Sequence, residues 1–199
     1  MLLEFYTNSS TIECGVDEAG RGCLCGGVFA SAVILPKNFS SKEALNDSKK
    51  LNSRQRDNLR KIIEKEAISF SVGFATNEEI DQINILKASF LAMQRAILGL
   101  KIKPDILLID GNRFVSKLDI PYYCIVKGDQ KYQSIAAASI LAKTYRDEYI
   151  TKMAEKYPQY LWNKNKGYPT KEHRMAIKEY GITPLHRKTF NLLGEETLF

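Results

Sequence analysis

The run ILLID at residues 106–110 decides how this chain can fold. Pro104 precedes it, and four consecutive apolar residues lead directly to an acid, Asp110. A continuous apolar run of this kind is typical of a strand that is covered on both faces. A further short run, PYYCIV at residues 121–126, follows, and Ser134 to Lys156 then has a mainly helical pattern that opens with small residues. We therefore expect strands here that pack closely against a long helix.

The same reasoning extends outward to the rest of the chain. Further β-rich runs occupy residues 12–17 (IECGVD), 27–35 (GVFASAVIL) and 67–75 (AISFSVGFA), and helical patterns occupy residues 53–66, about 84–100 and about 171–180. We expect Ser53 to be the N-cap of the first helix and residues 162–170 to be a turn-rich stretch. The early strands should pair as an antiparallel ribbon, and the later ones, joined through helices, should be parallel. This order predicts an α/β domain with one mixed sheet and helices on its faces.

Length and composition are those of an ordinary globular domain. The chain has 199 residues, of which 44% are hydrophobic and 26% charged, so one domain with its own core is expected. The longest mainly apolar run, residues 28–35, is far short of the roughly 20 residues that span a bilayer. The N-terminus has Glu4 and no basic segment, so we expect neither a membrane span nor a secretory signal.

The net charge indicates which partners the protein favours, and the cysteines indicate its cellular compartment. Lysine and arginine number 29 against 23 acids, a net charge of +6, which favours polyanions such as nucleic acids without requiring them. The cysteines are Cys14, Cys23, Cys25 and Cys124, and they form no C-x-x-C pair. We expect all four to be reduced and the protein to be cytoplasmic, because disulfides are rare in that compartment.

Carboxylates follow several of the expected strands. Asp17 and Glu18 end the first, Asp110 ends ILLID, and Asp129 lies just beyond residues 121–126. In open α/β sheets such strand ends form the functional crevice. Converging carboxylates need cations, and oxygen ligands without histidine or cysteine favour Mg²⁺ or Mn²⁺, two of which can act together in phosphoryl displacement. The alternative is that each acid is a solvated loop residue or a helix cap.

Glycines flank an arginine directly after the first acids, as Gly20-Arg21-Gly22. Glycine permits close backbone approach to a ligand, and exposed N–H groups in such a turn can bind an anion. The guanidinium of Arg21 also matches phosphate geometry. The alternative is an ordinary tight turn between two antiparallel strands.

Seven stretches together carry a family resemblance. They are GVDEAGRG (15–22), NDSKKL (46–51), ILLIDGN (106–112), VKGDQKYQSIAAASILAKTYRD (126–147), YP (157–158), NKGYPTKEH (165–173) and GITPLHRKTF (181–190). In this order they resemble type 2 ribonuclease H, or ribonuclease HII, of the bacterial kind. The resemblance implies a ribonuclease H-like fold with a mixed five-stranded sheet flanked by helices. It also implies a single catalytic domain over residues 1–199, with a helical C-terminal part from about residue 150.

The resemblance further implies an activity and its residues. The expected enzyme is an endonuclease that hydrolyses the RNA strand of RNA–DNA hybrids. It would also cut 5′ of single ribonucleotides in duplex DNA, leaving 5′-phosphate ends, as ribonucleotide excision repair requires. By position, the family's ligands for two Mg²⁺ or Mn²⁺ ions fall on Asp17, Glu18, Asp110 and Asp129. Its ribonucleotide-reading turn falls on Gly20, Arg21 and Gly22, and its junction-sensing tyrosine falls on Tyr168. Residues 23–27, CLCGG, lack prolines that many relatives have, which touches none of these ligands.

Other residues carry weaker expectations. Lys49, Lys50 and Lys143 are candidate phosphate contacts, and Ser48 is a candidate phosphate contact or turn cap; the alternative for each lysine is a solvated surface position. His173 and His186 are expected to have structural roles. The tail, residues 195–199 (EETLF), loosely resembles a sliding-clamp peptide, the alternative being a frayed or packed end. We expect a monomer.

Two other functions remain open on the residues alone. A DNA nuclease or transposase of the same fold would keep the carboxylates without needing the Gly20–Gly22 turn or Tyr168. A basic nucleic-acid-binding module would bind equally well in chelator, and replacing Asp17 would not abolish its function. Metal preference and the preference between single ribonucleotides and long hybrids are not readable from the sequence.

Overall fold

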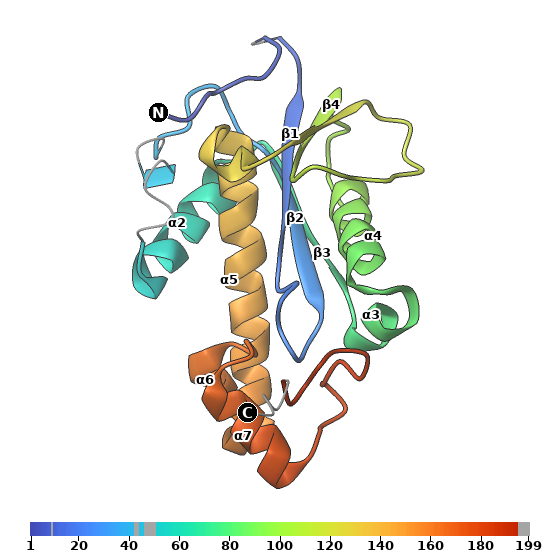
Figure 1. Ribbon diagram of the computed structural model, residues 1–199. Helices are drawn as coiled ribbons and strands as arrows, with labels where there is room; N and C mark the ends of the chain where they lie inside the picture. Colours follow the sequence, from blue (N-terminus) through green and yellow to red (C-terminus); the bar gives the residue numbers. More distant parts are fainter. Residues whose placement is uncertain (9, 42–43, 46–50, 195–199) are drawn as a thin grey trace.

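The fold was analysed in a computed structural model that describes residues 1–8, 10–41, 44–45 and 51–194 (Figure 1). The strands are β1 (Glu13–Ala19), β2 (Val28–Ile34), β3 (Ser69–Ala75), β4 (Ile106–Asp110) and β5 (Tyr122–Ile125). The helices are α2 (Ser53–Glu66), α3 (Asn77–Ile83), α4 (Ile85–Leu98), α5 (Gln133–Lys156), α6 (Trp162–Asn165) and α7 (Lys171–Tyr180), with short 3₁₀ turns η2 (Gly128–Gln130) and η3 (Pro158–Tyr160).

The strands form one mixed sheet in the order β3-β2-β1-β4-β5. β1 pairs antiparallel with β2, and β2 with β3, whereas β4 runs parallel to β1 and β5 runs parallel to β4. This confirms the expected antiparallel ribbon followed by parallel strands. Val16 pairs with Ile109, so the next residues, Asp17 and Asp110, lie at the same level on neighbouring strands.

Helices cover both faces of the sheet (Figure 1). α4 packs on one face, where Val16, Ala30, Met93 and Ile109 share a buried cluster. α5 and α2 pack on the other, where a second cluster joins Val33 to side chains of both helices. Because β2 is buried on both sides, its near-continuous apolar sequence has the same origin as that of ILLID.

The long helix α5 lies very close to β1. Gly15 faces it, and a Cβ built on Gly15 would collide with main-chain atoms of Ser134 and Ile135. Ala136, Ala137 and Ala138, at the start of α5, are completely buried. The expectation that small residues here permit close packing is therefore confirmed. The absence of a side chain at Gly15 on the strand is equally required for this contact.

The C-terminal elements form a third apolar cluster at the far end of α5 (Figure 1). α5 continues past residue 150 to Lys156 without a break, and η3, α6 and α7 gather around its last turns. Trp162 and Tyr160 lie at the centre of this cluster, with 0% and 1% exposure. The single helix α5 therefore connects the sheet to the C-terminal helices.

Three local features differ from what the sequence predicts. The N-cap of α2 is Asn52 rather than Ser53, because Asn52 and Gln55 form a reciprocal capping box. The expected helix over about 84–100 is confirmed as α4, but the short helix α3 before it was not expected; Asn84, with a positive φ of 68°, separates the two. The turn-rich stretch contains the short helix α6, which buries Trp162.

The described ranges contain neither a disulfide nor a helix that could span a membrane. Cys14, Cys23 and Cys25 are buried free thiols, and Cys124 is a half-buried free thiol. Among these residues no helix combines the length and the hydropathy that crossing a bilayer requires.

The contact between Gly15 and α5 leads to a stability prediction. We expect Gly15→Ala to lower the free energy of unfolding by about 2 kcal/mol or more, because the new methyl group meets rigid backbone and forces the helix away from the strand. Denaturant unfolding followed by circular dichroism measures this. Gly22→Ala is the matched control, since a Cβ there meets nothing within 4 Å. Equal stability of both variants would contradict the prediction.

Candidate active site

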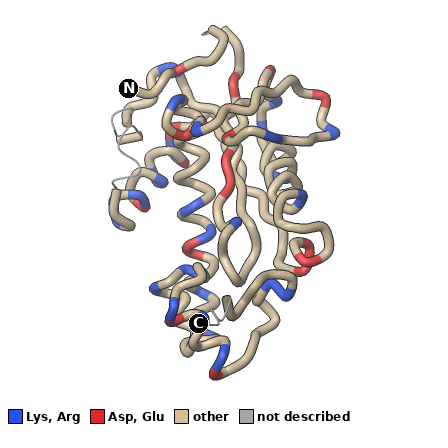
Figure 2. The backbone as a smooth tube through the Cα atoms, in the orientation of Figure 1, with Lys and Arg blue, Asp and Glu red and all other residues tan. Residues whose placement is uncertain are grey.

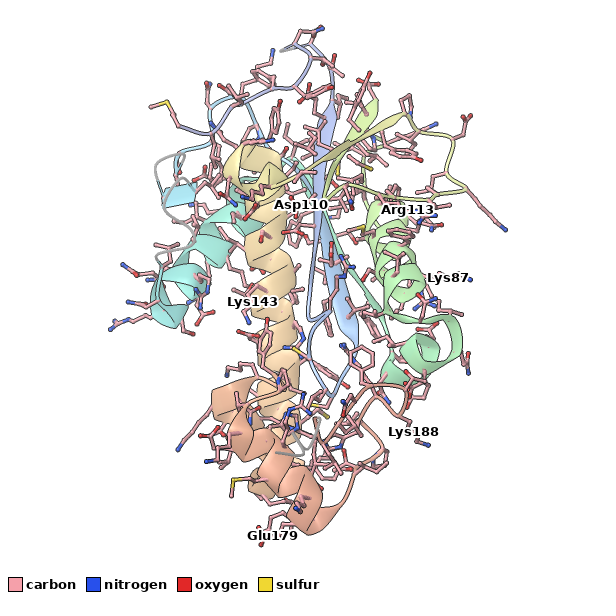
Figure 3. The ribbon with its side chains drawn as sticks, in the orientation of Figure 1. Lys87, Asp110, Arg113, Lys143, Glu179 and Lys188 are labelled. Atoms are coloured by element: carbon pink, nitrogen blue, oxygen red, sulfur yellow. The ribbon has the colours of Figure 1, made fainter. Side chains whose placement is uncertain are left out.

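The first two candidate acids are brought together by the register of β1 and β4. Asp17 and Asp110 both lie on the α5 face of the sheet, since the alternate residues Val16 and Ile109 belong to the cluster under α4. Asp17 is buried, with 6% exposure, and is hydrogen-bonded to Ser139 of α5. Figure 3 shows Asp110 beside the upper part of α5, between that helix and the sheet.

The other two acids flank this pair. Asp129 lies in η2, whose backbone folds onto Asp110: the Gly128 N–H donates to Asp110 Oδ1 at 2.6 Å and the Asp129 N–H donates more weakly at 3.4 Å. Glu18 follows Asp17, and its Oε1 accepts from Arg21 at 2.9 Å. The expectation that Asp17 and Glu18 end the first strand needs a small correction, because β1 continues to Ala19.

Burial and mutual repulsion make this acidic cluster costly to ionise. The pKa of Asp17 lies well above its usual range, chiefly because the carboxyl is buried and also because Glu18 and Asp110 are negative. Burial also raises the pKa of Glu18; Asp110 adds to this, while the guanidinium of Arg21 opposes it. Further positive charge beside Asp17 and Glu18 would therefore favour their ionised forms.

The carboxylate oxygens of these residues suit hard divalent cations, although the side chains are not close enough together to form a complete ligand set. Within the described part of the chain, no three His, Cys, Asp or Glu side chains lie close enough to hold one ion as they stand. The site nevertheless offers carboxylate oxygens from β1, β4 and η2, and the negative charges of Asp17, Glu18 and Asp110 repel one another. Oxygen-only donor sets of this kind suit Mg²⁺ or Mn²⁺, and bound ions would relieve the repulsion.

The Gly20–Gly22 turn lies next to the loop that carries Tyr168. The Leu24 N–H donates to the Gly167 carbonyl at 2.8 Å, and the Cys23 thiol lies 3.8 Å from the Lys166 carbonyl. The connection between β1 and β2 is therefore no simple tight hairpin turn: it spans residues 20–27 and is paired to a distant segment. Gly20 has a positive φ of 97°, which favours glycine.

Tyr168 and Lys143 lie side by side. Tyr168 is 39% exposed, and Lys143 Nζ lies 5.1 Å from the centre of its ring. The same ammonium pairs with Asp147, one turn along α5, at 2.9 Å. Figure 3 shows Lys143 midway along α5, and Figure 2 shows further basic residues along this helix and the C-terminal helices. The expected positions of Ser48, Lys49 and Lys50 lie outside the described residues.

The two histidines are buried beneath the Tyr168 loop rather than at the acids. His173 Nδ1 lies 2.9 Å from the Tyr168 carbonyl, and its Nε2 accepts from the Trp162 indole N–H at 2.9 Å. His186 Nδ1 accepts from the Thr183 N–H, and its Nε2 lies 3.3 Å from His173 Nε2. These partners require His173 to carry its proton on Nδ1 and His186 on Nε2.

Two buried arginines at the site were not among the residues predicted from the sequence. Arg146 of α5 and Arg187 after α7 are 1% and 0% exposed, and both contact the connection between β1 and β2. Their positions in YRD and HRKTF carried no signal of burial, because arginine is usually exposed. Only their membership in the stretches quoted above could have drawn attention to them.

The chain is similar to known proteins over nearly its whole length. The family model described as Ribonuclease HII matches residues 14–193. A Ribonuclease HII of Bacteroides thetaiotaomicron is 63% identical over 97% of this chain and 96% of that protein. Two solved structures have a TM-score of 0.76: ribonuclease H2 from Pyrococcus horikoshii, 28% identical with 91% and 94% of the two chains covered, and a PCNA:RNase HII complex from Archaeoglobus fulgidus, 26% identical with 94% and 98% covered.

The buried histidines predict how stability depends on pH. Burial lowers the pKa of His186 to about 4, with the neighbouring His173 adding to the effect, and burial also lowers the pKa of His173. Between about pH 6.5 and about pH 4 these histidines take up protons in the unfolded chain but not in the folded chain. We expect their contribution to the free energy of unfolding to fall by about 1–3 kcal/mol as the pH is lowered through this window, whereas Asp17 and Glu18, whose pKa values are raised, contribute with the opposite sign.

Urea unfolding at several pH values between 4.5 and 7.5 measures this effect. His186→Gln removes one of the two titrating groups, so its stability should depend less steeply on pH than that of the wild type. The same dependence in both proteins would show that the histidines do not titrate as described.

Proposed function

Because the chain belongs to the ribonuclease HII family and is therefore a ribonuclease H that acts on RNA–DNA hybrids, we propose a more specific activity for it. It cuts duplex DNA 5′ of single embedded ribonucleotides, leaving 3′-hydroxyl and 5′-phosphate ends, and so starts their removal. The reaction uses two divalent ions held by Asp17, Glu18, Asp110 and Asp129.

The observation that carries this proposal is the arrangement around the end of β1. The acidic cluster, the Gly20–Gly22 turn and the Tyr168 loop follow one another, with Glu18 paired to Arg21 and Leu24 hydrogen-bonded to Gly167. A sugar–phosphate unit at the acids therefore has exposed turn backbone and an exposed aromatic ring close by. The ribose 2′-hydroxyl is the group by which a protein distinguishes RNA from DNA locally.

Each part then has a chemical role. Asp17, Glu18, Asp110 and Asp129 would hold divalent ions by their carboxylate oxygens. Ions bound there would lower the pKa of a water molecule and stabilise the negative charge on the phosphate and on the leaving 3′ oxygen. The backbone of the Gly20–Gly22 turn hydrogen-bonds the 2′-hydroxyl, and the ring of Tyr168 packs on the sugar at the junction to DNA.

Lys143 is proposed to contact a phosphate beside Tyr168. Its side chain is 29% exposed, and its ammonium lies 5.1 Å from the centre of the Tyr168 ring while paired to Asp147. An ion pair this open to solvent is weak, so exchanging Asp147 for a phosphate costs little. Ser48 and Lys49 remain predicted phosphate contacts.

A partner outside the substrate is also proposed. The Archaeoglobus fulgidus relative was solved as a PCNA:RNase HII complex. By this likeness a sliding clamp is a candidate partner of the present chain, through residues 195–199. Those residues lie outside the described part of the structure.

A cleavage assay on three labelled duplexes tests the proposed activity: one embedded ribonucleotide in DNA, a long RNA–DNA hybrid, and DNA alone. With Mg²⁺ or Mn²⁺ we expect cutting 5′ of the ribonucleotide and within the hybrid, none in DNA, and none in chelator. Asp110→Asn should lower the rate by about 100-fold or more, because it removes a negative ligand from the cluster. Asp105→Asn, an acid just before β4 that accepts from the Ile12 N–H, is the matched control and should keep its activity.

Other outcomes select the alternatives. Cutting of the DNA duplex would favour a DNA nuclease of the same fold. Cutting of the hybrid alone would leave the chain a ribonuclease H and overturn its proposed action on single ribonucleotides. Binding of all three duplexes without cutting in either metal would favour the binding module.

The phosphate contact has its own test. Lys143→Ala should weaken binding to duplexes irrespective of sequence and reduce the slope of log Kd against log salt by about 1, because one fewer counterion is displaced. Fluorescence anisotropy over a range of salt concentrations measures this slope. Lys152→Ala is the matched control, since Lys152 forms a similar pair with Glu148 on the same helix. An unchanged slope in Lys143→Ala would remove Lys143 from the binding surface.

A further inference from the structure

The carbonyl groups of the Gly20–Gly22 turn have an unusual partner. The completely buried guanidinium of Arg187 donates to four main-chain carbonyls of the connection between β1 and β2. The distances are 2.7 Å to Gly20, 2.8 Å to Arg21, 2.9 Å to Gly26 and 3.3 Å to Gly27. One side chain therefore joins both ends of this connection.

These bonds determine where the next N–H groups point. In a trans peptide the N–H lies opposite the preceding C=O, and none of the described peptide bonds is cis. With the Gly20 and Arg21 carbonyls turned inward to Arg187, the N–H groups of Arg21 and Gly22 are directed away from the protein interior. Both residues are exposed, so two consecutive donors face outward beside the acids. Paired outward N–H groups of this kind bind oxygen atoms that carry negative charge or lone pairs.

Arg187 is itself held in place from a second direction. Asp81 of α3 accepts from the N–H groups of Lys188 and Thr189 at 2.9 and 3.0 Å and from the Thr189 hydroxyl at 2.7 Å. The Arg187 N–H also donates to the Leu24 carbonyl at 2.9 Å. The guanidinium thus reaches the turn from a segment with little freedom to follow any movement of the turn.

The other buried arginine closes the arrangement. Arg146 packs against the Cα of Gly20, where a Cβ would collide with it, and donates to the Lys166 carbonyl at 2.8 Å and the Cys25 carbonyl at 3.4 Å. Its guanidinium lies 5.8 Å from the ring centre of Tyr168. Gly20 therefore lies between two guanidinium groups, one of which also contacts the Tyr168 loop.

A lysine could not replace Arg187. Its carbonyl acceptors lie around a planar fork of five N–H donors, whereas an ammonium has three donors on one nitrogen. Burial lowers the pKa of Arg187 to about 10, so the group stays charged at neutral pH. A buried cation without these carbonyls would be very costly, which explains why each of the three guanidinium nitrogens donates to the backbone.

We propose that Arg187 is a positioning residue for ribonucleotide recognition: it fixes the peptide planes of the Gly20–Gly22 turn so that the Arg21 and Gly22 N–H groups face the substrate. This deepens the proposed function and rests on it, because the turn is taken to read the 2′-hydroxyl. Arg187 touches no substrate and acts through the turn alone.

The test combines a direct view of the turn with a kinetic assay. Amide signals of Gly20, Arg21 and Gly22 are followed by ¹⁵N–¹H NMR in wild type and in Arg187→Lys. The same proteins are assayed on the embedded-ribonucleotide duplex, with the all-DNA duplex of the same sequence as competitor. Arg174→Lys is the matched control, because Arg174 also donates to two carbonyls, those of Asn191 and Leu192, away from the turn.

We expect Arg187→Lys to shift or broaden the three turn signals and to lower kcat/KM by about 10- to 100-fold, as small misplacements of binding groups do. The inhibition constant of the all-DNA duplex should stay within about twofold, since phosphate contacts dominate duplex affinity. Arg174→Lys should change neither quantity. Should Arg187→Lys fail to fold, Asp81→Ala loosens the same segment, and we expect a smaller change of the same sign.

Three results would overturn the proposal. Unchanged turn signals would show that Arg187 does not set the turn. Changed signals with unchanged kcat/KM would show that the orientation of the turn does not matter. Equal losses in kcat/KM and in affinity for the all-DNA duplex would indicate a general structural role. If the wild type leaves the ribonucleotide duplex uncut, the proposed function fails instead, and the turn signals alone decide whether Arg187 sets the turn.

Discussion

The contact between α5 and β1 is the constraint on which most of the molecule depends. Because Gly15 has no side chain, the first turn of α5 rests directly on the strand backbone. That contact places Ser139 within reach of Asp17 and η2 beside Asp110, so the acidic cluster forms where helix and sheet are closest. The length of α5 then carries Lys143 and Arg146 to Tyr168, and the last turns of the helix support the C-terminal cluster. One helix thus links the acids, the turn and the aromatic loop.

Negative and positive groups are separated along β1 and the connection that follows it. Buried or half-buried carboxylates are gathered at one end of β1, and two buried guanidinium groups lie just beyond it, on either side of Gly20. Arg187 and Arg146 donate to main-chain carbonyls, whereas the half-exposed Arg21 pairs with Glu18. The two buried arginines hold backbone in place, and the acids offer oxygen ligands for cations from solution. This separation fits a site that must accept both metal ions and a phosphate backbone.

Much of the fold followed from local pattern. The five strands and the helices α2, α4, α5 and α7 were predicted close to their observed bounds, because burial of one or both faces imposes the periodicities of 2 and 3.6 on the sequence. The differences occurred at a helix cap, at a residue with positive φ and in a short helix with a buried tryptophan. Asn52 replaces Ser53 as the cap through its bond to Gln55, Asn84 divides α3 from α4 with a positive φ, and α6 forms around the buried Trp162. None of these contacts has a periodic signature.

The sequence by itself determined the mixed α/β architecture, the four acids and the glycine turn, because strand ends and glycine–arginine runs are local features with direct chemical meaning. The tertiary structure alone decided that Asp17 and Asp110 are neighbours through the pairing of β1 with β4, and that the two histidines lie beneath Tyr168 and away from the acids. It also decided that Arg187, a basic residue in a basic tail, is completely buried against carbonyls 160 or more positions away in the chain. Such contacts depend on the folding of distant segments against one another, and no local pattern of residues encodes which backbone groups a buried cation will meet.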